Sequence, residues 1–413
     1  MQTKAKITDP KYKMAFILVT TLFLMWGLSY GLVDVLNKHF QETLNVSKAQ
    51  SGLIQAAYFG AYFVIALPAG IFMEKKGYKS GIILGLALYA IGALLFVPAT
   101  SSNSYYFFLF ALFVLALGLG CLETAANPYS AALGSPQTAE TRLNLSQSFN
   151  GLGQFIGPLI GGFLFFSGSE VINNSEEAAS AQFSVMITYV VIAVIVLLIM
   201  LFFIKTPLPD LRNQEQELDA NEMAHGHTKS MWAHKEFVFG VITQFFYIAA
   251  QVGIGAFFIN LTVECWPDAT SQTGAFLLSI AMLALMVGRF VSTGIMTRVS
   301  PQKMLVIYGA VCVILSGIAA SAIDYVSVIA VVVTFFFISI MFPTIFAMGV
   351  KNLGSKTKLG SSFMIMSIVG GAIMPYFMGK LADQTHTSMS YALPLVCFVL
   401  VTIYGVIYKK LHS

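Results

Sequence analysis

Long apolar runs recur along the whole chain and constrain its fold more than any other feature. Each run is about 20 residues long, which is enough to cross a hydrocarbon core roughly 30 Å thick. Backbone polar groups in lipid must be satisfied within their own segment, so these runs are predicted to be helices rather than open strands. Twelve spans are predicted, near residues 14–36, 50–72, 80–99, 105–133, 144–167, 183–204, 238–262, 272–292, 304–322, 326–349, 360–380 and 390–408.

The composition excludes a soluble globular domain. Hydrophobic residues make up 57% of the 413 residues, and charged residues only 10%. Soluble domains carry about 25% charged residues. The sequence therefore predicts an all-α integral membrane protein with twelve transmembrane helices.

The distribution of Lys and Arg predicts the orientation in the membrane. If the N-terminus is cytoplasmic, all but three of the 23 Lys and Arg fall in cytoplasmic tails and loops or beside them. The exceptions are Lys38, Lys48 and Lys380. Cytoplasmic loops are enriched in Lys and Arg, so both termini are predicted to be cytoplasmic. In this assignment Arg142 belongs to the loop between spans four and five.

A long polar segment divides the chain into two halves of six spans. It covers residues 205–236 and separates an N-terminal half, 1–204, from a C-terminal half, 237–413. His225, His227 and His234 lie in this segment, but no Cys or second cluster accompanies them, so a solvated cytoplasmic linker is predicted rather than a metal site. The four cysteines are scattered and form no metal or disulfide pattern: Cys121, Cys265, Cys312 and Cys397.

Short repeats relate the two halves. The segment 70–79 resembles 294–303, and Thr141-Arg142-Leu143 resembles Thr357-Lys358-Leu359. Gly153, Pro158 and Gly162 match Gly370, Pro375 and Gly379. Six spans return the chain to its starting side, so the halves are predicted to be parallel, pseudo-symmetric repeats with a site between them, an arrangement found in one large transporter class.

Only two of the 19 acidic residues fall inside predicted spans: Asp34 and Glu123. An ionisable group in hydrocarbon costs several kcal/mol and marks functional sites by default. Burial disfavours the charged form of a carboxylate, so Glu123 is predicted to accept a proton. Asn127 lies one helical turn further on and can face the same cavity. Hydrogen bonding between helices without any role in transport is the alternative for Glu123.

Aromatic rings precede Asp34 on one face of the first predicted span. Trp26 and Tyr30 stand at steps of four before it. Sugars suit such a face, because their C–H groups stack on rings while their hydroxyls need fixed polar partners. The alternative for Asp34 is a structural ion pair with Lys38, one turn away.

Uncharged polar side chains recur at helical spacing in three other spans. These stripes are Gln147, Asn150 and Gln154; Gln244, Tyr247 and Gln251; and Gln55, Tyr58 and Tyr62. Amides in lipid need partners, so each stripe is predicted to face other helices or a wet cavity. Many amides and few charges favour a neutral polyhydroxylated substrate. An anionic substrate would need a cation in mid-span, and Arg289, the only candidate, lies near a cytoplasmic turn.

Several motifs resemble those of one transporter family. Residues 70–79 resemble the loop motif Gly-x-x-x-Asp-Arg-x-Gly-Arg-Arg of the major facilitator superfamily, with Glu74, Lys75 and Gly77 in the matching places. The segments that resemble the fucose permease branch, the fucose–galactose–glucose:proton symporters, are LETAANP at 122–128, RLNLSQSFN at 142–150, PTIF at 343–346, KNLG at 351–354 and KLGSSF at 358–363.

This resemblance implies proton-coupled import of a monosaccharide across a bacterial inner membrane by alternating access. It implies that Asp34 and Glu123 couple the proton and that Gln147 and Asn150 contact the sugar, alongside Trp26, Tyr30, Asn127 and the residues 244, 247 and 251 expected above. The family pattern has Asn residues where this chain has Gly31 and Val33, and a Trp where it has Gly255. Fucose, glucose, galactose, mannose and an amino sugar therefore all remain open.

Three other functions are weighed against the proton symporter. A sodium-driven or passive sugar carrier would use the same fold. A drug–proton exporter fits less well, because the amide stripes are too polar for its substrates. Enzyme chemistry has no support, since all six His lie in loops, tails or span ends and no phosphate-binding loop is evident. The expected partners are a small neutral sugar, a proton and the lipid bilayer, with no nucleic acid, cofactor or metal, and the chain is expected to act as a monomer.

Overall fold

The computed structural model describes residue 8 and residues 10–134, 138–166, 175–209, 230–296, 298–351, 353 and 357–411. Every regular element in these ranges is helical. The first half contains η1 (Pro10–Tyr12), α1 (Lys13–Thr43), α2 (Lys48–Ser51), α3 (Leu53–Lys76), α4 (Tyr78–Leu94), α5 (Phe96–Ser102), α6 (Tyr105–Ala132), α7 (Ala139–Phe165) and α8 (Ser175–Lys205).

The second half repeats this pattern with more breaks. It contains η3 (Met231–Ala233), α10 (Lys235–Ala256), α11 (Phe258–Cys265), α12 (Ser271–Met296), α13 (Pro301–Ala320), α14 (Asp324–Ile338), α15 (Met341–Val350), α16 (Thr357–Met366), η5 (Ser367–Val369), α17 (Gly370–Gln384), α18 (Thr387–Ser390) and α19 (Ala392–Leu411). Of the predicted linker 205–236, residues 210–229, which include His225 and His227, lie outside the described part.

Eleven segments of the described chain are long and apolar enough to cross a membrane. The remaining predicted span, 144–167, corresponds to α7, which has 27 residues but is not apolar enough to meet that criterion. It carries Arg142, Gln147, Asn150 and Gln154, whose polarity offsets its apolar residues. The twelve predicted spans are therefore all helical, and the most polar of them lies inside the bundle.

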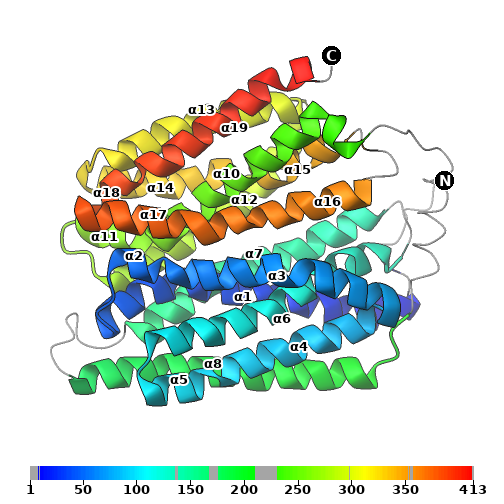
Figure 1. Ribbon diagram of the computed structural model, residues 1–413, viewed down its shortest axis with the longest axis horizontal. Helices are drawn as coiled ribbons and strands as arrows, with labels where there is room; N and C mark the ends of the chain where they lie inside the picture. The colour runs from blue at the N-terminus through cyan, green and yellow to red at the C-terminus, as the bar shows by residue number, and fades with distance from the viewer. Residues whose placement is uncertain are drawn as a thin grey trace.

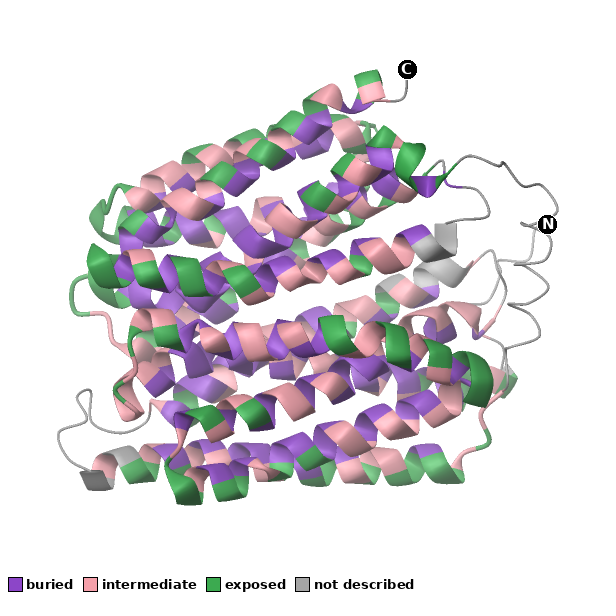
Figure 2. Cartoon of the chain, in the orientation of Figure 1, coloured by how far each residue is buried: buried purple, intermediate pink, exposed green. Residues whose placement is uncertain are grey.

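The helices form two groups that lie side by side (Figure 1). α1 to α8 form one group and α10 to α19 the other, with α1, α3 and α7 of the first facing α12 and α17 of the second. Many residues on the outer flanks are exposed (Figure 2), and large hydrophobic side chains are common among the exposed residues, as a lipid-facing surface requires. Val194, Leu198 and Phe202 of α8, for example, are 51%, 51% and 62% exposed.

Glycines related by the sequence repeat lie at equivalent helix contacts in the two halves. A Cβ on Gly153 would lie 2.3 Å from the carbonyl oxygen of Leu24, which brings α7 against α1. Its repeat partner, Gly370, would meet the carbonyl oxygen of Phe245 at 2.2 Å, which brings α17 against α10. Only glycine permits backbones to approach this closely. The two halves are therefore built on the same close helix pair, as the repeat predicts.

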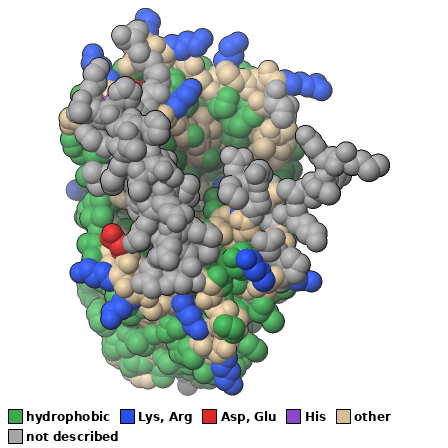
Figure 3. Space-filling view, turned by 90° about the vertical axis from the view of Figure 1, so that its right-hand side faces the viewer, with side chains coloured by type: hydrophobic (Ala, Val, Ile, Leu, Met, Phe, Trp, Pro, Cys, Tyr) green, Lys and Arg blue, Asp and Glu red, His purple; other side chains and the backbone are tan. Residues whose placement is uncertain are grey.

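The helices α1 and α19 respectively begin and end at the same end of the bundle, called here the terminal side (Figure 1). Lys and Arg side chains surround this face (Figure 3). One basic residue differs from the sequence-based assignment. Arg142 is fully buried within α7 rather than exposed in a loop. It donates hydrogen bonds to the carbonyl oxygens of Ser130 and Ala131, so it satisfies groups at the C-terminal end of α6.

Several polar contacts join the two halves at the opposite end of the bundle, called here the far side. Asp383 of α17 accepts hydrogen bonds from the backbone N–H groups of Lys48 and Ala49, at 3.0 and 2.9 Å. Gln41 and Asn260 exchange amide hydrogen bonds of 3.4 and 2.6 Å. The hydroxyl of Ser271 donates to Glu42 at 2.6 Å. The halves are therefore joined at the far side.

Candidate functional site

Glu123 and Asn127 lie one turn apart on α6, as their spacing predicts. The amide nitrogen of Asn127 donates to the backbone carbonyl of Glu123 at 3.2 Å. The amide of Gln147 on α7 donates to Oδ1 of Asn127 at 3.1 Å. The side chain of Glu123 is partly exposed, and no described residue bonds to its carboxyl group. The structure therefore joins Asn127 to Gln147 and leaves the carboxylate beside them unpaired.

The α7 stripe continues toward the far side. Asn150, which is 3% exposed, accepts a hydrogen bond of 2.7 Å from Gln154. Its own amide nitrogen donates to the carbonyl oxygen of Phe23 on α1 at 3.3 Å. Asn150 thus anchors α7 to α1, while Gln147 links α7 to α6.

The predicted aromatic face of α1 meets the α3 stripe. Trp26 lies beside Tyr62, and the ring of Tyr30 meets Phe59 edge-on with centroids 6.0 Å apart. Tyr58 and Tyr62 are hydrogen-bonded through their hydroxyls at 3.4 Å, and both lie near Glu123. The rings of α1 and α3 therefore lie on the same side of the bundle as the Glu123 carboxyl group.

Asp34 lies at the contact between the halves. It is 3% exposed, and a Cβ on Gly255 of α10 would lie 2.8 Å from its Oδ2. That oxygen has no hydrogen-bond partner in the described chain. The proposed ion pair with Lys38 is not formed, because Lys38 instead pairs with Glu42 at 3.3 Å. Glu42 is one further turn along α1, where the longer side chains reach each other near the helix end.

One polar side chain of α3 lies beside Asp34. Gln55 is its polar neighbour, and Gln55 accepts a hydrogen bond of 3.2 Å from Asn37, three residues after Asp34. Asn37 is itself fully buried. Its spacing from Asp34 on the same helix face was the signal that could have added it to the candidate site.

The α10 stripe divides between bonded and unbonded groups. The hydroxyl of Tyr247 donates to the carbonyl oxygen of Ile338 at 3.0 Å, and Tyr30 of the other half lies nearby. Gln244 is fully buried, and neither its Oε1 nor its Nε2 finds a partner among the described atoms. Gln251 is partly exposed, and the structure does not connect it to the α6–α7 amides.

Arg289 lies deeper than its sequence position near a turn indicated. Its Nε donates to the carbonyl oxygen of Ser339 at 3.4 Å, and it lies close to Tyr247. Ser339 follows the end of α14, near the middle of the 27-residue span Asp324–Val350. The sequence placed Arg289 near a turn because it is close to the end of α12, but the depth of its side chain depends on the contact with Ser339.

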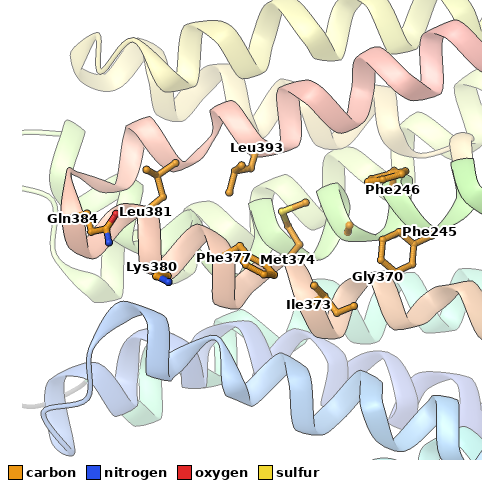
Figure 4. A pocket seen from close by; sticks show the side chains of 11 residues that line it. Phe245, Phe246, Gly370, Ile373, Met374, Phe377, Lys380, Leu381, Gln384 and Leu393 are labelled. Carbon is orange, nitrogen blue, oxygen red and sulfur yellow. The ribbon is translucent and has the colours of Figure 1, made fainter.

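One groove in the bundle surface lies away from these residues. It has a volume of about 450 Å³ and runs between α10, α17 and α19, where Phe245, Met374 and Phe377 are among the residues that line it (Figure 4). None of the candidate site residues lines it, and its walls are almost entirely apolar. The chemistry therefore has to be sought between the halves rather than in this groove.

Comparison with known proteins gives a family and several close relatives. The family model of the Major Facilitator Superfamily matches residues 15–375. The L-fucose-proton symporter of Escherichia coli (strain K12) is 38% identical over 407 residues, which cover 95% of this chain and 93% of the relative. The glucose/galactose transporter of Brucella abortus is 36% identical over 404 residues, covering 98% and 96%.

Solved structures agree with the fold. The crystal structure of the transporter FucP in the outward conformation has a TM-score of 0.69 at 35% identity and covers 96% of this chain and 99% of its own. The xylose transporter XylE from E. coli, in a partially occluded inward open conformation, has a TM-score of 0.73, covers 95% and 99%, and is only 12% identical. At this identity, the likeness to XylE supports the fold alone.

Proposed function

Because the chain belongs to the major facilitator superfamily and its relatives are symporters and transporters of sugars, we propose that it imports a neutral monosaccharide together with a proton. It is a multi-pass membrane transporter and not an enzyme. The substrate site lies between the halves 1–204 and 237–413, which the segment 205–236 connects. Fucose, glucose, galactose, mannose and an amino sugar all fit this proposal.

The proposed setting is a bacterial inner membrane with both termini in the cytoplasm. The ring of Lys and Arg on the terminal side supports it (Figure 3), because cytoplasmic faces are enriched in these residues. On this assignment the far side is periplasmic. A single chain supplies both walls of the site, which favours the monomer as the transport unit.

The observation that carries the proposal is the unpaired carboxyl group of Glu123 beside the Asn127–Gln147 hydrogen bond. Protonated, this carboxyl group can donate to a sugar hydroxyl; ionised, it can only accept. A bound proton therefore favours one arrangement of sugar and amides, and proton release weakens it. A gradient can drive uptake only through such a difference in affinity between states.

The proposed role of Asp34 is to link protonation to movement of the halves. Its buried Oδ2, which has no hydrogen-bond partner in the described part of the chain, faces Gly255 of the opposite half. An ionised carboxylate is costly in this place, because burial without a partner penalises a charge. Protonation of Asp34 therefore favours the state in which the far side is closed.

The test is sugar accumulation in proteoliposomes under an imposed proton gradient. Glu123→Gln is expected to abolish accumulation and the pH dependence of sugar binding, because the amide cannot take up a proton. Asp34→Asn is expected to abolish accumulation but to retain exchange of labelled sugar at equilibrium, because the neutral amide mimics the protonated carboxyl group. The matched control is Asp268→Asn, since Asp268 is exposed and lies outside the spans.

Normal gradient-driven accumulation by Glu123→Gln contradicts the proposed mechanism. Uptake that continues when an uncoupler dissipates the proton gradient while a sodium gradient is held identifies a sodium-driven carrier instead.

A further inference from the structure

Arg289 is a cation inside the bundle that the proposed mechanism does not use. Charged side chains within membrane spans are costly, and they mark functional sites by default. Its one hydrogen bond to a described residue runs from Nε to the carbonyl oxygen of Ser339. Within the described chain, neither of its terminal nitrogens, Nη1 and Nη2, has a protein acceptor, and no carboxylate pairs with it.

A break in a membrane-spanning helix holds the guanidinium in place. α14 ends at Ile338 and α15 begins at Met341. The carbonyl oxygen of Ile338 accepts from the hydroxyl of Tyr247, and that of Ser339 accepts from Arg289. The C-terminal end of a helix carries partial negative charge, which stabilises the cation without neutralising it. The terminal nitrogens Nη1 and Nη2 are therefore available to bind a ligand.

The contact between α7 and α12 sets the depth of Arg289. A Cβ on Gly162 would meet Ala275 at 3.1 Å, and one on Gly151 would meet Met286 at 3.2 Å. Gly151 lies eleven residues before Gly162, and Met286 lies eleven residues after Ala275. The two helices therefore run antiparallel in register. Three residues beyond Met286, Arg289 reaches the level of Ser148, adjacent to Gln147. It therefore lies across the interface from the Asn127–Gln147 pair.

Unsatisfied polar atoms accompany Arg289 on its own half. Among the residues that the structure describes, the buried hydroxyl of Ser339 has no partner, and neither do the two amide atoms of Gln244, one turn from Tyr247. Buried polar groups are normally hydrogen-bonded, and each exception asks for an explanation. A ligand that carries several hydroxyl groups could bond to Arg289 and Ser339 at the helix break and to Gln244 on α10.

We infer that Arg289 is a sugar-binding residue, which holds two neighbouring hydroxyl oxygens of the sugar from the second half while Asn127 and Gln147 hold it from the first. This inference rests on the proposed function. The guanidinium presents two donors in a rigid planar fork, which suits an adjacent pair of oxygens. A substrate bound in this way bridges the halves.

The balance of charge specifies a neutral sugar. Asp34, Glu123 and Arg289 together carry zero net charge when one of the two carboxyl groups is protonated. A neutral sugar then enters a site that is already balanced, whereas a sugar acid would add an uncompensated negative charge to a buried place.

The test measures binding of fucose, glucose, galactose, mannose and N-acetylglucosamine to purified protein by titration calorimetry. For any sugar that the wild type binds, Arg289→Gln is expected to raise Kd by about 10- to 100-fold, the loss typical of hydrogen bonds to a charged group. Arg289→Lys keeps the charge without the fork, so an intermediate Kd is expected. Arg298→Gln, an exposed neighbour beyond the end of α12, is expected to leave Kd unchanged.

Thermal unfolding without sugar separates binding from folding. Both Arg289 variants are expected to unfold near the wild-type temperature in the absence of sugar. Arg289→Gln should lose most of the stabilisation that sugar adds, and Arg289→Lys should lose part of it. If Arg289→Gln does not fold, Arg289→Lys alone decides the result. Wild-type affinity in the Arg289 variants overturns this inference and leaves the proposed function standing. A wild type that binds none of the five sugars overturns both.

Discussion

The carboxyl oxygen Oδ2 of Asp34 lies 2.8 Å from the place where a side chain on Gly255 would begin. The two residues belong to opposite halves, α1 and α10, so the absence of a side chain at 255 is what permits this closed contact. Packed interiors have little free space. A single added methyl group therefore acts directly on the position of Asp34.

Gly255→Ala is expected to open the far side. The added methyl group collides with Asp34 only when the halves are joined, and overpacking of this kind costs about 1–3 kcal/mol. Spin labels on Ser102→Cys and Ser321→Cys, exposed residues at the far ends of the two halves, should move apart in distance measurements. The four native cysteines are buried, which keeps labelling selective. Gly70→Ala is the control, because nothing lies within 4 Å of its Cβ position. An unchanged distance distribution in Gly255→Ala contradicts the prediction.

Gln147→Ala is expected to weaken sugar binding. It removes an amide that the proposal places on the sugar and leaves Oδ1 of Asn127 without its donor. A neutral hydrogen bond contributes about 1 kcal/mol, so Kd should rise by roughly fivefold or more. Calorimetric titration measures the change, and Gln384→Ala, at the exposed end of α17, serves as the control. Equal affinity in wild type and Gln147→Ala removes this residue from the sugar site.

Asp383→Asn is expected to loosen the contact between the halves at the far side. The carboxylate accepts from two backbone N–H groups at the start of α2, and an amide side chain retains only one oxygen acceptor and no charge. Hydrogen bonds to a charged group contribute about 1.5–3 kcal/mol. The Ser102–Ser321 label distance should therefore shift toward longer values. The same distribution in variant and wild type would show that this contact does not hold the closed state.

Glu264→Gln is expected to lower stability by the same amount throughout pH 5.5–8. Burial alone would raise the pKa of Glu264, but hydrogen bonds from Ser388 and Thr387 outweigh it and hold this pKa below its ordinary value of 4.5. A depressed carboxyl pKa contributes stability above the ordinary pKa, and that stability disappears as the pH falls through the folded value. The melting-temperature difference should therefore shrink only below about pH 4.5. A difference that changes between pH 6 and 8 contradicts this assignment.

Glu264→Gln also serves as a control for the pH dependence of transport. Its carboxylate stays ionised across the working range, so Glu264→Gln should leave the shape of the uptake-against-pH curve unchanged while Glu123→Gln flattens it. A shared effect of both variants on that shape would remove the special role given to Glu123.

Some of the site followed directly from the order of residues. Charges are so costly in hydrocarbon that Asp34 and Glu123 stand out in the sequence before any helix is placed. The spacing of Glu123 and Asn127 predicted one shared helix face, and in the structure the two residues lie one turn apart on α6, where the amide of Asn127 donates to the backbone carbonyl of Glu123. The helical class and the twelve spans rest on similarly local patterns, because apolar length and helical period are properties of one segment. The duplicated halves followed from comparing segments of the sequence with each other, which also needs no tertiary structure.

The tertiary structure alone decided which polar groups meet. It paired Lys38 with Glu42 rather than Asp34, brought Gln147 to Asn127, buried Arg142 at the end of α6, and set Arg289 against the break after α14. Such contacts depend on the rotation and register of helices that are distant in the chain. The period of a single helix fixes neither, because close packing at residues such as Gly153 and Gly255 determines how far one helix slides and turns against another.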